Sequence, residues 1–190
     1  MLTSDLSQLI RSRRSVYPHQ FNSKPISKDV LEECLENAHW APNHKLTEPW
    51  RFKVLRNEKK DDFADFFAET YKLVTPSEKF LEAKYEKLKS KVNQSSAVIV
   101  IYFHRDPLER LPEWEELAAV SMAVQNFWLT AAAHGIGMYW GSPGLINHVD
   151  DFFQPRKNEN CLGFLFMGYH DEPGQKPTKG NLEDRVEWMD

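Results

Sequence analysis

Three arginines and two serines occupy five consecutive positions near the start of the chain, in the segment Arg11-Ser12-Arg13-Arg14-Ser15. Guanidinium groups bind phosphate oxygens through paired hydrogen bonds, and serine hydroxyls supply further donors. The same cations could instead stabilise the C-terminal end of a helix, where unpaired carbonyl groups carry partial negative charge. The cluster therefore predicts either a site for one small anion or a cationic helix cap, and residue type alone does not choose between them.

A second candidate is the segment 39–52, HWAPNHKLTEPWRF, which contains two prolines, two tryptophans and two histidines. Aromatic loops of this kind form flat pockets for planar ligands. His44 lies in the middle of the segment, where it either contacts a ligand or fills a structural role. No second histidine or acidic residue stands at a metal-ligating spacing from it, so we expect no metal site.

Two further segments combine backbone freedom or positive charge with a loop. Glycines in YWGSPG (139–144) let the backbone approach a ligand closely, although an ordinary turn would use them as well. Lys176 and Lys179, in GYHDEPGQKPTKG (168–180), either bind an anion or are simply solvated. The chain contains no GxGxxG at a strand-to-helix junction, no GxSxG and no Walker lysine motif, which argues against the corresponding nucleotide-binding and hydrolase sites.

The composition predicts one globular domain over residues 1–190, with 41% hydrophobic and 27% charged residues. A net charge of −4 and a pI of about 6.0 argue against a general nucleic-acid-binding protein. No apolar run approaches the roughly 20 residues of a membrane-spanning helix, and the N-terminus lacks the apolar core of a signal peptide. Because only two cysteines occur, at no metal-ligand spacing, we expect a cytoplasmic protein with reduced thiols.

The elements that must position these segments follow from apolar periodicity. Helices are predicted at 3–14, 28–40, 59–74, 113–135 and, more briefly, 145–154, with strands at 51–56, 97–104 and 159–170. Residues 77–91 are predicted to form an exposed helix or a mobile lid, and 137–144 a glycine-rich turn with a short strand start. Long connections between the strands indicate a layered sheet flanked by helices. The helix at 113–135 is apolar on most sides and therefore needs burial from more than one direction.

Taken in order, the four segments resemble those of the FMN-dependent nitroreductase family. In its compact length the chain looks most like the short YdjA-type NAD(P)H nitroreductases of that family. The matching positions are Arg13-Arg14-Ser15 for the opening motif, Ala41-Pro42 with Pro49-Trp50 for the AP…(Q/E)PW loop, Trp140-Gly141-Ser142 for the third flavin segment, and Gly168-Tyr169 for the tail. The sequence departs from many larger members at Leu46, where they carry asparagine, and at Glu48, where they carry glutamine.

The resemblance implies a three-layer α/β/α fold of the α+β class, with a central mixed, largely antiparallel sheet. It implies a homodimer that shares two FMN sites at its interface and uses NADPH or NADH to reduce nitroaromatics, quinones or similar small electrophiles by ping-pong hydride transfer. The alternatives are a flavin-binding protein that acts on a specific metabolite or stores flavin, and a non-enzymatic module that binds an anion or nucleic acid.

The resemblance also assigns roles to residues. The cofactor-binding positions it implies are Arg13, Arg14, Ser15, Trp40, His44, Trp140, Gly141, Ser142 and Lys176. The NAD(P)H-binding positions it implies are Thr130, Ala131, Ala132, Ala133, His134 and Gly135. We expect no essential catalytic residue, because the hard chemistry belongs to the flavin; His44 as a proton donor is a hypothesis.

Overall fold

Four strands form the central sheet of the computed structural model, which describes residues 3–172 and 176–189. Their order is β1-β2-β4-β3, and each neighbouring pair runs antiparallel. The strands are β1 (Trp50–Leu55), β2 (Ala97–His104), β3 (Ile136–Gly141) and β4 (Glu159–Tyr169). The predicted strands at 51–56, 97–104 and 159–170 are confirmed to within one residue.

β2 occupies a central position because its side chains are apolar on both faces. Ile99 and Ile101 point to one side of the sheet, and Val98 and Val100 point to the other, as the alternation of a strand requires. All four are fully buried. The sheet therefore separates two hydrophobic clusters, each of which needs a layer of helices.

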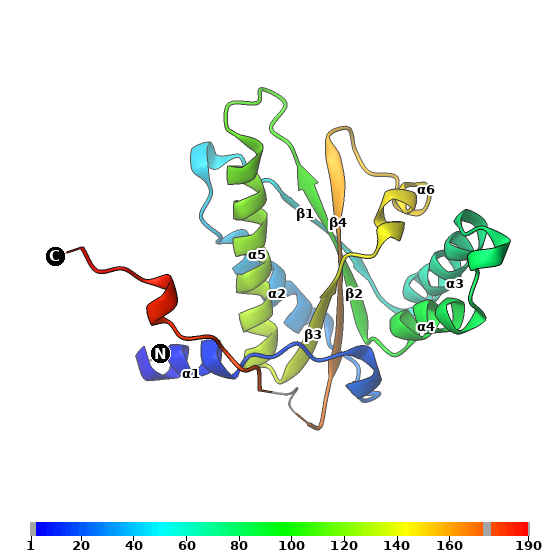
Figure 1. Cartoon of the computed structure of the whole chain (residues 1–190), viewed down its shortest axis with the longest axis horizontal. Helices are drawn as coiled ribbons and strands as arrows, with labels where there is room; N and C mark the ends of the chain where they lie inside the picture. Colours follow the sequence, from blue (N-terminus) through cyan, green and yellow to red (C-terminus); the bar gives the residue numbers. More distant parts are fainter. Residues whose placement is uncertain (1–2, 173–175, 190) are drawn as a thin grey trace.

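Helices cover both faces of the sheet (Figure 1). On one face lie α2 (Lys28–His39) and α5 (Glu113–Ala133), and on the other lie α3 (Asn57–Val74), α4 (Glu82–Asn93) and the short α6 (Asp150–Phe153). The expected three-layer α/β/α fold is confirmed. Within the described residues, no helix is both long enough and apolar enough to cross a membrane.

α1 (Thr3–Ser12) lies at the edge of the molecule and buries none of its residues. It ends two residues earlier than predicted, so Arg13 and Arg14 belong to the segment that follows it. That segment reaches β3, where Ser15 forms an isolated parallel bridge with Met138. The bridge supplies the parallel component of an otherwise antiparallel sheet.

One expectation needs correction. Residues 137–144 were expected to be mainly a turn, whereas Ile136–Gly141 form the full strand β3, because pairing with β4 outweighs the weak strand preference of glycine. At 77–91 the expected helix is present: a short 3-10 turn at Ser77–Lys79 leads into α4, which buries Leu88 and Val92. The predicted helix at 145–154 consists of a 3-10 turn, Gly144–His148, followed by α6.

Candidate functional site

Arg13 and Arg14 lie where the chain leaves α1 and crosses to β3. The Arg13 guanidinium sits over the indole ring of Trp128 in α5, 4.6 Å from the ring centroid. Burial lowers the pKa of Arg13, and the neighbouring charge of Arg14 lowers that pKa further. Arg14 Nη1 donates to the carbonyl oxygens of Arg11 at 2.7 Å and Arg13 at 2.9 Å. The predicted helix cap is therefore a role of Arg14, whereas Arg13 makes no such bond to the end of α1.

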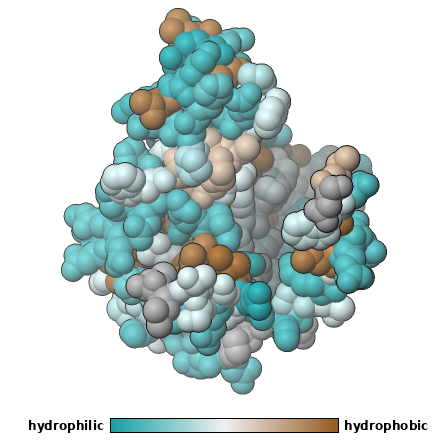
Figure 2. All heavy atoms as spheres, turned by 90° about the vertical axis from the view of Figure 1, so that its left-hand side faces the viewer, coloured by the Kyte–Doolittle hydropathy of each residue, from teal (hydrophilic) through white to brown (hydrophobic). Residues whose placement is uncertain are grey.

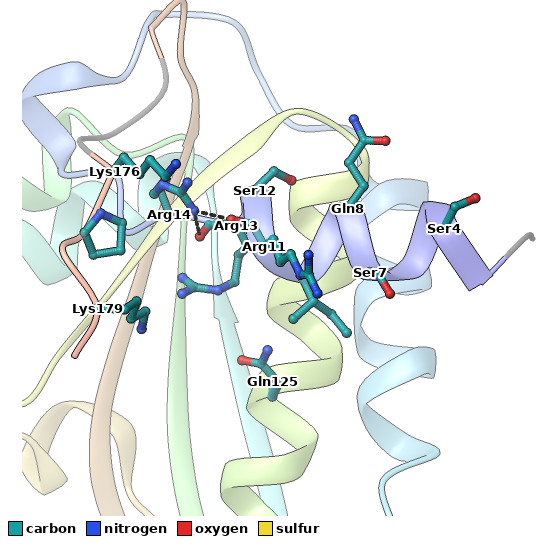
Figure 3. A pocket seen from close by; sticks show the side chains of 12 residues that line it. Ser4, Ser7, Gln8, Arg11, Ser12, Arg13, Arg14, Gln125, Lys176 and Lys179 are labelled. Carbon is teal, nitrogen blue, oxygen red and sulfur yellow. Dashed lines mark hydrogen bonds between the residues drawn. The ribbon is translucent and has the colours of Figure 1, made fainter. Parts of the chain in front are cut away.

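A cavity of about 1030 Å³ opens between α1, α5 and the C-terminal segment 176–179 (Figure 3). Its wall carries five cationic side chains: Arg11, Arg13, Arg14, Lys176 and Lys179. A second cavity of about 790 Å³ shares the last four of these cations and adds Ser15, Tyr17 and His19. The predicted segment 168–180 thus brings its two lysines to the arginines, although its residues 173–175 lie outside the described residues.

The positive charge around these cavities has no carboxylate partner among the residues that the structure describes. Across residues 3–172 and 176–189, none of the five cations forms an ion pair with a carboxylate. Uncompensated cations lining a concave surface attract an anion, and arginine matches the oxygens of a phosphate group. The arrangement can therefore hold a phosphate, as the first interpretation of the arginine cluster predicts.

Close contact with β3 fixes the position of this cationic segment. Val16 N donates to Met138 O at 3.1 Å, directly after the Ser15 bridge. A Cβ atom added at Gly137 would lie 2.6 Å from Val16 Cβ and 2.8 Å from His170 Cδ2. Only glycine permits such an approach, so Gly137 is part of what positions the cations.

His44 lies near the opposite end of α5, beside Glu115, whereas Trp40 directly follows α2, whose Asn37 contacts Thr130 and Asn126 of α5. His44 Nδ1 is 2.8 Å from Glu115 Oε2 in the first turn of α5, whereas Arg13 meets Trp128, about 20 Å further along the helix. Trp40 is 77% exposed and donates from Nε1 to Glu36 at 3.1 Å. One chain therefore does not bring His44 to the cations.

No group of three or more His, Cys, Asp and Glu side chains in residues 3–172 and 176–189 could hold a metal ion. The carboxylate of Glu115 beside His44 is thus a single partner and not one member of a metal-ligand set.

Trp140, Gly141 and Ser142 follow Met138, the bridge partner of Ser15, by two to four residues at the end of β3. Trp140 Nε1 donates to Leu162 O at 3.2 Å, and its ring packs against the core cluster under α2 and α5. Gly141 is buried and Ser142 is exposed. None of the three lines the cavities that contain the cations.

The stretch Thr130–Gly135 forms the C-terminal end of α5 and the turn that follows it. Ala131 is fully buried, and Thr130 Oγ1 accepts from Asn37 and donates to Asn126 O. His134 pairs with Glu33 at 2.9 Å. Ala132 and Gly135 do reach a small cavity of about 180 Å³ behind Arg13 and Arg14.

Lys91 in α4 is a candidate that the sequence analysis did not single out. Its Nζ lies 5.6 Å from the ring centroid of Tyr139, and that ring in turn packs 4.7 Å from Tyr17 at the second cavity. Burial lowers the pKa of Lys91, and the charge of Lys87 lowers it further. The available signal was helical spacing: Lys91 has Lys87 one turn before it and no acidic residue three or four positions away.

Sequence comparison relates the chain to known proteins over most of its length. Residues 10–169 match the Nitroreductase family. The chain is 32% identical over 189 residues to "Putative NAD(P)H nitroreductase YfhC" of Bacillus subtilis (strain 168), covering 98% of this chain and 95% of that protein. It is 24% identical over 166 residues to "Putative NAD(P)H nitroreductase YdjA" of Escherichia coli (strain K12), covering 86% and 87%.

Solved structures show the same fold. A nitroreductase-like family protein from Bacillus cereus superimposes with a TM-score of 0.81 at 28% identity, covering 100% of this chain and 98% of that one. The FMN-dependent nitroreductase NfnB from Mycobacterium smegmatis, in complex with NADPH, superimposes with a TM-score of 0.80 at 15% identity, covering both chains completely. The second similarity concerns the fold alone.

Proposed function

The chain belongs to the nitroreductase family of FMN-dependent NAD(P)H oxidoreductases, and from that premise we propose that it reduces nitroaromatics, quinones or similar small electrophiles by ping-pong hydride transfer. When bound, FMN would accept a hydride from NADPH or NADH and pass it to the acceptor after the oxidised nucleotide leaves. The protein's part is then to anchor the cofactor, to supply planar walls and to stabilise charge.

One observation carries the proposal: five cations surround a cavity and lack carboxylate partners among the described residues. This donor set fits the phosphate of FMN, since arginine forks and lysine ammonium groups both bind phosphate oxygens strongly. Arg13 is the central member, because Trp128 holds its guanidinium and it faces both large cavities. Lys176 and Lys179 reach the same anion from the other end of the chain.

We assign a second role to Lys91 and the ring pair Tyr17–Tyr139. The two rings offer an aromatic surface beside the second cavity, and Lys91 adds a partly desolvated cation next to it. Hydride transfer brings negative charge into such a site, and a fixed cation stabilises it. Lys91 is thus suited to stabilising the negative charge that arises when FMN is reduced, whereas the arginines are suited to binding the cofactor.

The separation of His44 from the cations supports a homodimer. Apolar side chains are exposed along α5 at Trp114 and Met122 and along α1 at Leu6 and Ile10. Figure 2 shows hydrophobic side chains, in brown, among hydrophilic ones on one face of the molecule. A second copy related by a two-fold axis across α5 would run its helix in the opposite direction. Its Trp40 and His44 would then approach the first copy's cations, and the shared site would be completed twice.

A cytoplasmic location is part of the same proposal. Cys34 and Cys161 are both free, and burial raises their pKa values to about 12 and about 11. Thiols of this kind remain protonated and unreactive in a reducing compartment.

The test starts from the purified full chain. We expect a yellow protein that absorbs at about 450 nm, as oxidised FMN does, bleaches anaerobically with NADPH or NADH, and regains its colour when a quinone or nitroaromatic is added. Analytical ultracentrifugation should give about twice the 22.2 kDa mass of one chain.

Other outcomes identify the alternatives. A yellow protein that neither nucleotide bleaches would indicate flavin storage or a flavin-dependent step on a specific metabolite. A colourless protein that shifts an oligonucleotide, with strong dependence on salt, would indicate a nucleic-acid-binding module. Steady-state kinetics with both nucleotides would decide between NADPH and NADH.

A further inference from the structure

The loop Ala41–Pro49, which we call the His44 loop, has an unusual backbone. Lys45 and Leu46 both have φ of 53°, and Glu48 has φ of 41°. Residues other than glycine rarely adopt this left-handed region, and they persist there only where surrounding contacts hold them. Three such residues within four positions indicate a loop whose shape is fixed from outside.

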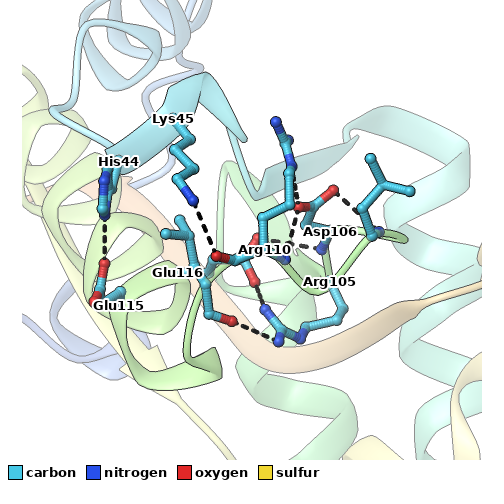
Figure 4. Close-up of polar contacts among 9 residues, drawn as sticks. His44, Lys45, Arg105, Asp106, Arg110, Glu115 and Glu116 are labelled. Atoms are coloured by element: carbon cyan, nitrogen blue, oxygen red, sulfur yellow. Dashed lines mark hydrogen bonds and ion pairs between the residues drawn. The ribbon is translucent and has the colours of Figure 1, made fainter.

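Hydrogen bonds tie the His44 loop to itself and to its neighbours. Asn43 Oδ1 accepts from Glu48 N at 3.0 Å, and Arg51 Nη1 donates to Glu48 O at 2.7 Å. Two further contacts reach the start of α5: Lys45 Nζ donates to Arg110 O at 3.3 Å, and His44 Nδ1 meets Glu115 Oε2 at 2.8 Å (Figure 4).

The start of α5 is itself held by a buried network (Figure 4). The Glu116 side chain is completely buried, and it accepts from the guanidinium of Arg105 and from Asp106 N at 3.2 Å. Asp106 accepts from Arg110 Nε at 2.7 Å, a bond that holds the pKa of Asp106 below its usual value. Because Glu115 adjoins Glu116, this network fixes the turn that carries the partner of His44.

The contact with Glu115 determines which ring nitrogen of His44 is free. An ionised carboxylate only accepts hydrogen bonds, so Nδ1 must carry a proton to form this one. In the neutral ring Nε2 is then an acceptor, and in the protonated ring it is a donor. No described residue takes Nε2, and the side chain is 60% exposed, so this nitrogen is presented to whatever lies outside the chain.

We propose that Glu115 is a positioning residue that fixes His44 as its Nδ1–H tautomer and directs Nε2 toward the FMN site of a second copy. The second half of this inference rests on the proposed function, because it needs the flavin and the homodimer. The first half concerns this chain alone. The role resembles that of carboxylates behind metal-bound histidines, which set the tautomer and orientation of the ring without touching the ligand.

Nitrogen NMR tests the tautomer directly. Long-range ¹H–¹⁵N spectra of the ¹⁵N-labelled full chain would be recorded at about pH 8, above the usual histidine pKa, with His44→Gln used to assign the signals of His44. We expect Nδ1 to be protonated and Nε2 unprotonated. Glu115→Gln retains an acceptor oxygen and should keep this pattern, whereas Glu115→Ala should shift His44 toward the Nε2–H tautomer.

Glu113→Ala is the matched control, since Glu113 is exposed in the same turn and should leave His44 unchanged. Titration with FMN provides the second measurement. We expect Glu115→Ala to raise the dissociation constant of FMN about threefold to tenfold, Glu115→Gln to raise it less than about twofold, and Glu113→Ala to leave it unchanged.

The possible results test the positioning role of Glu115 and the link between His44 and the flavin separately. An Nε2–H tautomer in the unmodified protein, or an Nδ1–H pattern that survives Glu115→Ala, overturns the positioning role whether or not FMN binds. The expected tautomers together with unchanged FMN affinity in Glu115→Ala overturn the link between His44 and the flavin. A protein that binds no FMN at all overturns the proposed function, and that result is visible before any variant is made.

Discussion

The two ends of α5 carry charge in opposite ways. At the C-terminal end, Arg13, Arg14 and their neighbours gather around cavities without a carboxylate partner among the described residues. At the N-terminal end, Arg105 pairs with Glu116, Arg110 with Asp106, and His44 with Glu115. The described residues thus leave the cations at the C-terminal end unpaired, whereas they pair the charged groups named at the N-terminal end.

This difference distinguishes a ligand-binding region, at the C-terminal end of α5, from a supporting region at the N-terminal end, which holds the His44 loop. Burial disfavours the charged form of Arg13, and the neighbouring charge of Arg14 adds to that cost, which is why the pKa of Arg13 is lowered. An anion that enters the cavity offsets the repulsion between the cations, so a bound anion stabilises this end of α5 most. At the N-terminal end of α5 the cations already have carboxylate partners, and this end holds the strained His44 loop in one shape.

The largest effect that we expect comes from removing the central cation. Arg13→Ala should weaken FMN binding by about 1.5–3 kcal/mol, the size of a charge-assisted hydrogen bond. Fluorescence titration of the apoprotein with FMN measures it. Arg156→Ala is the control, because Arg156 is an exposed arginine that lies outside the cationic cavities. Equal affinity in the two variants would mean that the unpaired end is not the phosphate site.

Gly137→Ala tests whether β3 positions the cations. Its Cβ would collide with Val16 and His170, so we expect a loss of about 1–3 kcal/mol in the free energy of unfolding, measured in urea, together with weaker FMN binding. Gly144→Ala offers a control, since nothing lies within 4 Å of its added Cβ. A Gly137→Ala protein of unchanged stability would contradict the tight contact.

Trp40→Ala distinguishes a ligand contact from a structural one at the residue that follows α2. Because the ring is 77% exposed, we expect the free energy of unfolding to change by less than about 0.5 kcal/mol. FMN binding should nevertheless weaken by about 1 kcal/mol if the ring covers the partner's cofactor. The same substitution of Leu73, which is exposed on α3, should change neither quantity. Unaltered FMN affinity in Trp40→Ala would exclude Trp40 from the FMN site.

The smallest effect concerns Lys91, whose lowered pKa gives a signed dependence on pH. Between its lowered folded value and the usual 10.5, the unfolded chain holds a proton that the folded protein has lost, so this group makes stability rise with pH. Lys91→Met removes the buried charge and should be more stable than the unmodified protein by about 0.5 kcal/mol at pH 8. The advantage should shrink toward pH 10 in urea unfolding curves. A difference that stays constant over this range would show that Lys91 is fully solvated.

Much of the fold could be predicted from local pattern. The continuous β-branched run of β2 and the long apolar helix α5 are strong signals, because their side chains must be buried wherever they lie in the fold. β3 was partly missed because Gly137 and Gly141 weaken a strand in isolation. Its stability comes from pairing with β4, a contact between segments that are distant in the chain.

In the candidate site, too, some residues could be predicted from the sequence, whereas others depend on contacts between distant segments. Residue type and the family resemblance were enough to select Arg13, Arg14 and Lys176, since few side chains bind phosphate. They did not find Glu115, which pairs with His44 across 71 positions of sequence, or the unpaired state of Lys91 beside Tyr139.

The sequence by itself determined which groups are available: the cations near the N-terminus, the aromatic loop, the apolar helix and the family to which they belong. Only the tertiary structure decided which charges are neutralised within the chain and which are left for a ligand. The physical reason is that ion pairing depends on separations of a few ångströms in space, and folding sets those separations between residues that the linear order keeps far apart.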